Sequence, residues 1–144
     1  MAENTNQILI FLPVLVLVAL TAVGFVRMAS GRAAAVKGGH DPAFYRAHLG
    51  APEPEVATAG ARHWDNLFEL PTLFYAGCLT AFILGGVSSW TLAFAWIFAV
   101  LRVVQSVIHM TYNAPTQRGG AFALSVVFVF ALWVNVGMTI IAGI

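Results

Sequence analysis

Four long runs of apolar residues constrain this chain more than any other feature. They fall at about residues 8–28, 54–84, 90–112 and 117–144. A helix needs about 20 apolar residues to cross the roughly 30 Å of hydrocarbon in a bilayer. Charged residues make up only 9% of the chain, against about 25% in soluble domains, so they are too few to cover a globular surface in water. The sequence therefore predicts an all-α integral membrane protein.

The connections between the runs predict how the helices pack. Short turns make neighbouring helices antiparallel, which predicts a four-helix bundle and a single transmembrane domain over residues 1–144. The first run is expected to be a retained helix, because Glu3 precedes it and no small-residue cleavage site closes it. Residues 29–57 are polar, and Asp41-Pro42 predicts a short helix that ends near Leu49. Pro71 is expected to kink the second long helix.

Net charge and cysteine content exclude several classes of function. The formal net charge of +1 gives no basic surface for a nucleic acid, so no such partner is expected. Cys78 is the only cysteine, which rules out a disulfide within the chain and a thiolate metal cluster. We expect no metal, and we expect Cys78 to pack as a small hydrophobic residue.

Polar side chains inside the predicted spans are the candidate functional residues, because such groups are costly in a membrane. In the second helix, Arg62, Asn66 and Glu69 have the spacing of one helix face. Steps of three or four residues also place one set on a single face of the third helix: Arg102, Gln105, Ser106 and His109. Arg102 lies about 15 Å from the nearer end of that helix, close to mid-membrane, so Glu69 is its expected partner.

Two interpretations of these faces stay open. Glu69 and Arg102 could form a structural ion pair that fixes the register of two helices. The surplus of polar groups instead favours a ligand site, since Arg binds carboxylates, Asn serves amides and Glu accepts an ammonium. His109 is either an interfacial ring or a proton relay, and Tyr112 is either an interface aromatic or part of the site.

Two motifs carry a resemblance to a known family. The segment from Arg62 to Pro71, Arg-His-Trp-Asp-Asn-Leu-Phe-Glu-Leu-Pro, resembles the helix-two signature of the membrane-associated proteins in eicosanoid and glutathione metabolism, the MAPEG family. Arg102-Val-Val-Gln-Ser-Val-Ile-His109, with Arg118 after a proline, resembles the helix-three signature, and the Phe-Glu-Leu-Pro form is similar to a bacterial branch. In well-studied members that use glutathione, Tyr stands at the position of His109, and His is common where Gln105 stands.

The resemblance implies a homotrimer that binds glutathione between protomers as a co-substrate. It implies that five residues match glutathione-binding positions: Arg62, Asn66, Glu69, Arg102 and Arg118. We add Gln105 and Tyr112 to the expected binding set, and assign Arg118 to thiolate stabilisation and His109 to proton relay.

Three functions are consistent with this sequence. The leading hypothesis is a membrane-embedded glutathione-dependent transferase or peroxidase that acts on lipophilic electrophiles from the bilayer. The second is a non-catalytic lipid- or ligand-binding membrane protein of the same fold. The third is a small proton-coupled transporter with Glu69 as its intramembrane acid.

The distribution of Lys and Arg predicts the orientation in a bacterial inner membrane. Five basic residues lie in or beside the first loop: Arg27, Arg32, Lys37, Arg46 and Arg62. Arg118 lies at the third loop. We therefore predict that the first and third loops face the cytoplasm and that both termini lie outside. Cysteines placed at Glu3 and Lys37 should react from opposite sides, Glu3 from outside; the reversed pattern would contradict this orientation.

Overall fold

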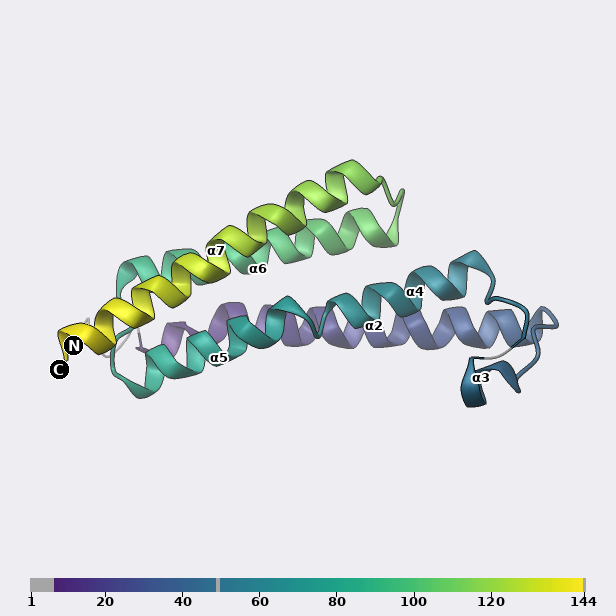
Figure 1. Cartoon of the computed structure of the whole chain (residues 1–144), viewed down its shortest axis with the longest axis horizontal. Coiled ribbons are helices and arrows are strands. Elements are labelled where there is room, and N and C mark those ends of the chain that lie inside the picture. The colour runs from purple at the N-terminus through teal and green to yellow at the C-terminus, as the bar shows by residue number, and fades with distance from the viewer. Residues whose placement is uncertain (1–6, 49, 144) are drawn as a thin grey trace.

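A computed structural model of the chain describes residues 7–48 and 50–143, which form helices joined by turns and loops. Figure 1 shows the elements in chain order: α2 Phe11–Lys37, α3 Phe44–Ala47, α4 Glu55–Asn66, α5 Leu70–Ile83, α6 Ser89–Met110 and α7 Pro115–Ala142. Within the described residues, 4 helical segments are long and apolar enough to cross a membrane, with α4 and α5 together forming one of them. The predicted all-α fold with four membrane-spanning segments is confirmed.

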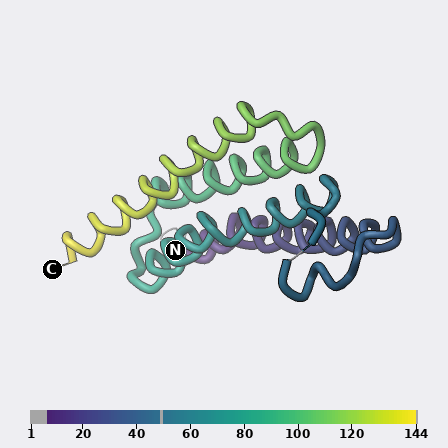
Figure 2. Tube along the Cα trace, turned by 45° about the vertical axis from the view of Figure 1, so that its right-hand side comes forward, coloured from purple at the N-terminus to yellow at the C-terminus, as the bar shows by residue number. Residues whose placement is uncertain are grey.

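The spans pack as two hairpins. Figures 1 and 2 both show α6 and α7 side by side, lying over the pair made by α2 and the α4–α5 helix. The core between them contains Phe74 of α5 stacked on Phe98 of α6, with ring centroids 4.6 Å apart. Leu17 and Leu132 are buried in the same cluster. Figure 1 shows the start of α2 and the end of α7 at one end of the bundle, and α3 at the other.

The first helix is longer than the sequence predicted, since α2 passes Met28 and ends at Lys37. Its last turns include Ala33, Ala34 and Ala35, and alanine is the strongest helix former. Gly31, which belongs to the polar segment 29–57 that follows the first apolar run, is buried inside this helix. A methyl group on Gly31 would lie 3.3 Å from the carbonyl oxygen of Val56, so its lack of a side chain permits the close approach of α4.

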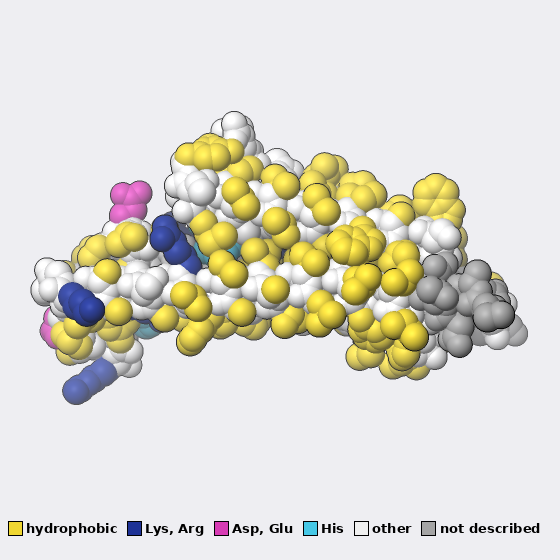
Figure 3. Space-filling model, turned by 180° about the vertical axis from the view of Figure 1, so that it is seen from behind, with side chains coloured by type: hydrophobic (Ala, Val, Ile, Leu, Met, Phe, Trp, Pro, Cys, Tyr) yellow, Lys and Arg dark blue, Asp and Glu magenta, His cyan; other side chains and the backbone are white. Residues whose placement is uncertain are grey.

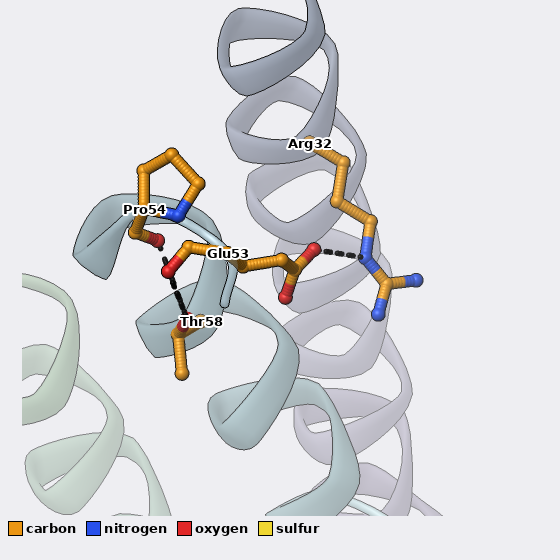
Figure 4. Close-up of polar contacts among 4 residues, drawn as sticks. All are labelled: Arg32, Glu53, Pro54 and Thr58. Carbon is orange, nitrogen blue, oxygen red and sulfur yellow. Dashed lines mark hydrogen bonds and ion pairs between the residues drawn. The ribbon is translucent and has the colours of Figure 1, made fainter. Parts of the chain in front are cut away.

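The polar segment after α2 folds back onto that helix. Asp41 accepts a hydrogen bond from the backbone N–H of Ala43 at 2.9 Å, and the short helix α3 follows at Phe44–Ala47. The predicted end of this helix, Leu49, lies outside the described residues. Figure 4 shows Arg32 reaching Glu53 just before α4, with 3.3 Å between Arg32 Nε and Glu53 Oε1. The same view shows the Thr58 hydroxyl donating a hydrogen bond to the Pro54 carbonyl, within the first turn of α4.

The second long helix is broken near the proline, as the sequence predicted. α4 ends at Asn66 and α5 begins at Leu70, with Pro71 in its first turn. Proline lacks an N–H and its ring clashes with the carbonyl four residues earlier, which here belongs to Leu67. The break therefore falls on residues 67–69, just before Pro71, and it frees backbone carbonyls inside the bundle.

The other two spans begin and end close to the predicted residues. Ser88 caps α6, because its side chain accepts a hydrogen bond from the Thr91 N–H at 3.2 Å. Thr91 also donates to Asn135 Oδ1 of α7 at 2.6 Å, which ties this end of the hairpin together. α7 begins at Pro115 and is described to Ala142, whereas the predicted last residue, Ile144, lies outside the described residues.

The surface matches the predicted membrane environment. The face in Figure 3 shows hydrophobic side chains over the length of the spans, while Lys, Arg, Asp and Glu gather toward the end with the long connection. Large apolar residues such as Val26, Val104 and Val134 are exposed along the helices, where lipid would cover them.

Small residues set the distance between α2 and α4. A methyl group on Gly60 would lie 3.2 Å from Met28 Cα and 3.4 Å from the Arg27 carbonyl oxygen, both of them backbone atoms. Helix pairs in membranes are stabilised by such close backbone approach. A side chain at Gly60 could be accommodated only if α2 moved away.

We predict that Gly60→Leu destabilises the protein because it separates α2 from α4, at a cost of about 1–3 kcal/mol for overpacking. Gly137→Ala is the control, since a methyl group there meets no atom within 4 Å. Thermal unfolding in mild detergent should show a lower Tm for Gly60→Leu and an equal or slightly higher Tm for Gly137→Ala, since alanine favours a helix more than glycine does. Equal Tm values for Gly60→Leu and the wild type would contradict this packing.

Candidate functional site

Arg102 is the most deeply buried charged residue of the predicted site, with 1% of its surface exposed. Its Nη2 donates a hydrogen bond to the backbone carbonyl of Asn66, the last residue of α4. That carbonyl lies where the helix breaks before Pro71. The helix break therefore supplies the acceptor that a guanidinium in the interior of a membrane protein requires.

The remaining donors of Arg102 point to a ligand. In the part of the chain that the structure describes, its Nε and Nη1 have no hydrogen-bond partner, and neither has Oε1 of Gln105, one turn further along α6. Gln105 is 4% exposed. Buried polar groups are nearly always hydrogen-bonded, and leaving one unpaired costs about 1–3 kcal/mol. These atoms therefore form a set of donors and acceptors that a polar ligand could satisfy.

A cavity of about 210 Å³ opens beside this pair, lined by Asn66, Gln105, Arg118, Gly119 and Phe122. The ring of Phe122 also lies 5.7 Å from the Arg102 guanidinium carbon. Arg118, in the first turn of α7, is half-buried and donates to Asn113 Oδ1 at 2.8 Å. Side chains from α4, α6 and α7 thus meet here. Three of the predicted site residues line this cavity, namely Asn66, Gln105 and Arg118, and Arg102 lies next to them.

Glu69 departs from the expected direct pairing with Arg102. It is exposed at the N-cap of α5, and no ion pair within residues 7–48 and 50–143 joins it to Arg102. The cause is the helix break. Steps of four and three residues place Arg62, Asn66 and Glu69 on one face only if the helix is continuous. Arg62 is also exposed. Two charged side chains of one predicted site therefore lie on the outer surface of a single protomer.

His109 and Tyr112 also lie outside this cavity. Tyr112 is 62% exposed and donates its hydroxyl to Gln117 Oε1 at 2.7 Å. His109 packs edge-to-face on His63, with ring centroids 5.1 Å apart, and both line a second cavity of about 390 Å³. His63 is not among the site residues predicted from the sequence, although an ionisable residue within a span is itself a signal of function. No group in the described part of the chain has three or more side chains that could hold a metal ion.

Fold and site define an integral, multi-pass helical membrane protein with a polar cavity among its spans. The MAPEG family model matches residues 8–138, nearly the whole chain, and the protein belongs to the MAPEG family. The predicted resemblance is thereby confirmed. No match was found among curated proteins or among solved structures.

We predict that Arg102 and Glu69 contribute very differently to stability. Arg102→Met should lower the free energy of unfolding by about 1–3 kcal/mol, because it leaves the Asn66 carbonyl without its donor. Glu69→Gln should change the stability of the isolated protomer by about 0.5 kcal/mol or less, since its carboxylate is exposed and forms no ion pair within residues 7–48 and 50–143. Denaturation in detergent at low protein concentration checks both. A loss for Glu69→Gln equal to that for Arg102→Met would show that the two residues do pair.

Proposed function

We propose that this protein is a glutathione-dependent transferase or peroxidase that acts on lipophilic electrophiles within the membrane. Membership of the MAPEG family supports a glutathione-related role. The observation that carries the proposal is the set of unpaired buried atoms on Arg102 and Gln105 beside the cavity that Arg118 lines. Cationic and amide groups of this kind suit a ligand with carboxylates and peptide bonds.

The chemistry of each residue suggests its place in glutathione binding. Arg102 would hold a carboxylate through Nε and Nη1, while its Nη2 stays on the Asn66 carbonyl. Gln105 and Asn66 would bond the peptide groups. The half-buried Arg118 would face the sulfur, where a cation lowers the thiol pKa from about 8.5 and so raises the thiolate fraction.

In conjugation the thiolate would form a C–S bond with the electrophilic carbon while the leaving group, a halide in the case of an aryl halide, departs with its bonding electrons. With a hydroperoxide it would form an S–O bond while the O–O bond breaks, which gives glutathione sulfenic acid and, after protonation, the alcohol. A second glutathione would then reduce the sulfenic acid, giving the disulfide and water.

A second protomer is part of the proposal. The cavity of about 210 Å³ is smaller than the roughly 300–1,000 Å³ of typical ligand pockets. Arg62 and Glu69 are exposed on the outer surface, and charged side chains within a span rarely face lipid. A homotrimer in which a neighbouring copy covers these residues would complete the site and give Glu69 a ligand ammonium to accept. His109 is given no part in this scheme, because it is buried and lines the other cavity. Tyr112 is given none, because its hydroxyl already donates to Gln117 Oε1.

The exposed Glu69 also favours one other function. An intramembrane acid that forms no direct ion pair is the feature that a proton-coupled transporter requires, and no ion pair to Glu69 occurs in the described residues. Proton flux into proteoliposomes that Glu69→Gln abolishes, without any glutathione-dependent turnover, would support the transporter. Glutathione binding without turnover would instead support the non-catalytic binding protein.

Wild-type protein should bind glutathione by calorimetry, and thiolate absorbance should appear on mixing if Arg118 stabilises the anion. It should also conjugate an aryl halide or reduce a lipid hydroperoxide. The absence of binding and of both activities would overturn the proposal.

We predict that Arg118→Ala reduces turnover more than it reduces glutathione affinity, because thiolate stabilisation matters most on the path to the transition state. Arg62→Ala and Glu69→Ala should mainly weaken binding, by about ten- to a hundred-fold for each lost charge-assisted contact. Calorimetry and steady-state kinetics on the same samples separate the two effects. Equal losses of affinity and turnover in Arg118→Ala would contradict its assigned role.

A further inference from the structure

The larger cavity, of about 390 Å³, belongs to a different part of the bundle. It lies between α2, α4 and the end of α6, and shares no lining residue with the cavity beside Arg118. Its polar lining comes from six residues: Arg27, Glu55, His63, His109, Thr111 and Asn113. Figure 3 shows basic and histidine side chains together in a recess on one face.

Two buried histidines line this cavity. His63 is 3% exposed and His109 is 5% exposed. Among the described residues, Nε2 of His63 and Nδ1 of His109 have no hydrogen-bond partner, although buried polar atoms normally have one. An imidazole can place a proton on either nitrogen, so each of these two lining rings has the capacity to donate one hydrogen bond to a ligand oxygen after a small rotation of the side chain.

The cavity also contains one fixed charge of each sign. Arg27 and Glu55 both line it. They form no ion pair with each other in the described part of the chain, where the ion pair joins Arg32 to Glu53. Arg27 donates one long bond, of 3.4 Å, from Nη2 to the Met110 carbonyl, which leaves its other N–H groups for a ligand. Opposite charges that share a cavity without pairing are the arrangement expected for a zwitterionic ligand.

The mouth of the cavity lies at the edge of the apolar part of the bundle. Arg27 is the first charged residue after the apolar run of α2, and Val26 beside it is 65% exposed. Val56, which lines the cavity next to Glu55, is 54% exposed. Exposed aliphatic side chains beside charged ones mark the boundary between lipid tails and headgroups. A ligand that reaches this cavity can therefore keep its acyl chains in the bilayer.

We propose that this cavity binds the headgroup of a zwitterionic phospholipid with a primary ammonium, of the phosphatidylethanolamine type. The phosphate accepts hydrogen bonds from Arg27 and from the imidazoles of His63 and His109. The ammonium lies against the Glu55 carboxylate. A purely anionic headgroup gains nothing from Glu55, and free phosphate gains nothing from the apolar mouth. This assignment does not depend on the proposed catalytic function.

The four histidines of the chain make the site observable by NMR of ring-labelled protein in detergent. His40→Gln and His48→Gln, both in the connection between α2 and α4, identify two signals and leave those of His63 and His109. Titration with short-chain dihexanoyl phosphatidylethanolamine should shift these two signals and leave those of His40 and His48 in place. No shift, or shifts confined to His40 and His48, would overturn the proposal.

Three comparisons complete the test. Arg27→Gln should weaken the interaction at least about tenfold, as expected for the loss of a charge-assisted contact, while Arg46→Gln on α3 should not. Glu55→Gln should abolish the preference for the ethanolamine lipid over the matching phosphatidylglycerol. Equal wild-type affinity for both lipids would overturn the assignment of the ammonium to Glu55. Equal affinity for inorganic phosphate would overturn the assignment to a lipid.

Discussion

The hydrogen bond from Arg102 to the Asn66 carbonyl is the interaction on which the arrangement of the spans depends. A guanidinium that is 1% exposed needs acceptors, and a helix that breaks before Pro71 leaves carbonyls that need donors. The hydrogen bond gives the guanidinium an acceptor and gives the Asn66 carbonyl a donor. The contact ties α6 to the break between α4 and α5, and it orients the remaining N–H groups of Arg102 near the cavity that Arg118 lines.

Close packing of α2 on α4 gives the bundle a second fixed contact. Gly31 and Gly60 allow backbone atoms of the two helices to approach each other, and the Arg32–Glu53 ion pair holds the connection beyond them. This geometry also positions His63 of α4 against His109 of α6, with Arg27 of α2 lining the same cavity. Two polar cavities therefore lie in one small bundle, and residues of α4 and of α6 contribute to each.

The sequence predicted the fold well because membrane spans depend mainly on length and apolarity, which are local properties. It predicted the site less completely. Regular spacing placed Glu69 on the face of Arg62 and Asn66, but the break at residues 67–69 ends that regularity, so Glu69 lies exposed and away from an ion pair with Arg102. His63 could not be assigned to a site from the sequence, because its contact with His109 depends on how α4 and α6 are rotated against each other. Spacing within one helix does not contain that rotation.

A structure determined by experiment after soaking with glutathione tests the central claim most directly. We predict that Arg102 keeps its bond to the Asn66 carbonyl while a glutathione carboxylate reaches its Nε and Nη1, with Gln105 and Arg118 in contact with the same molecule. We also predict that a neighbouring protomer covers Glu69. A monomer in which Arg102 has left the Asn66 carbonyl to pair with Glu69, with no glutathione bound, would contradict it.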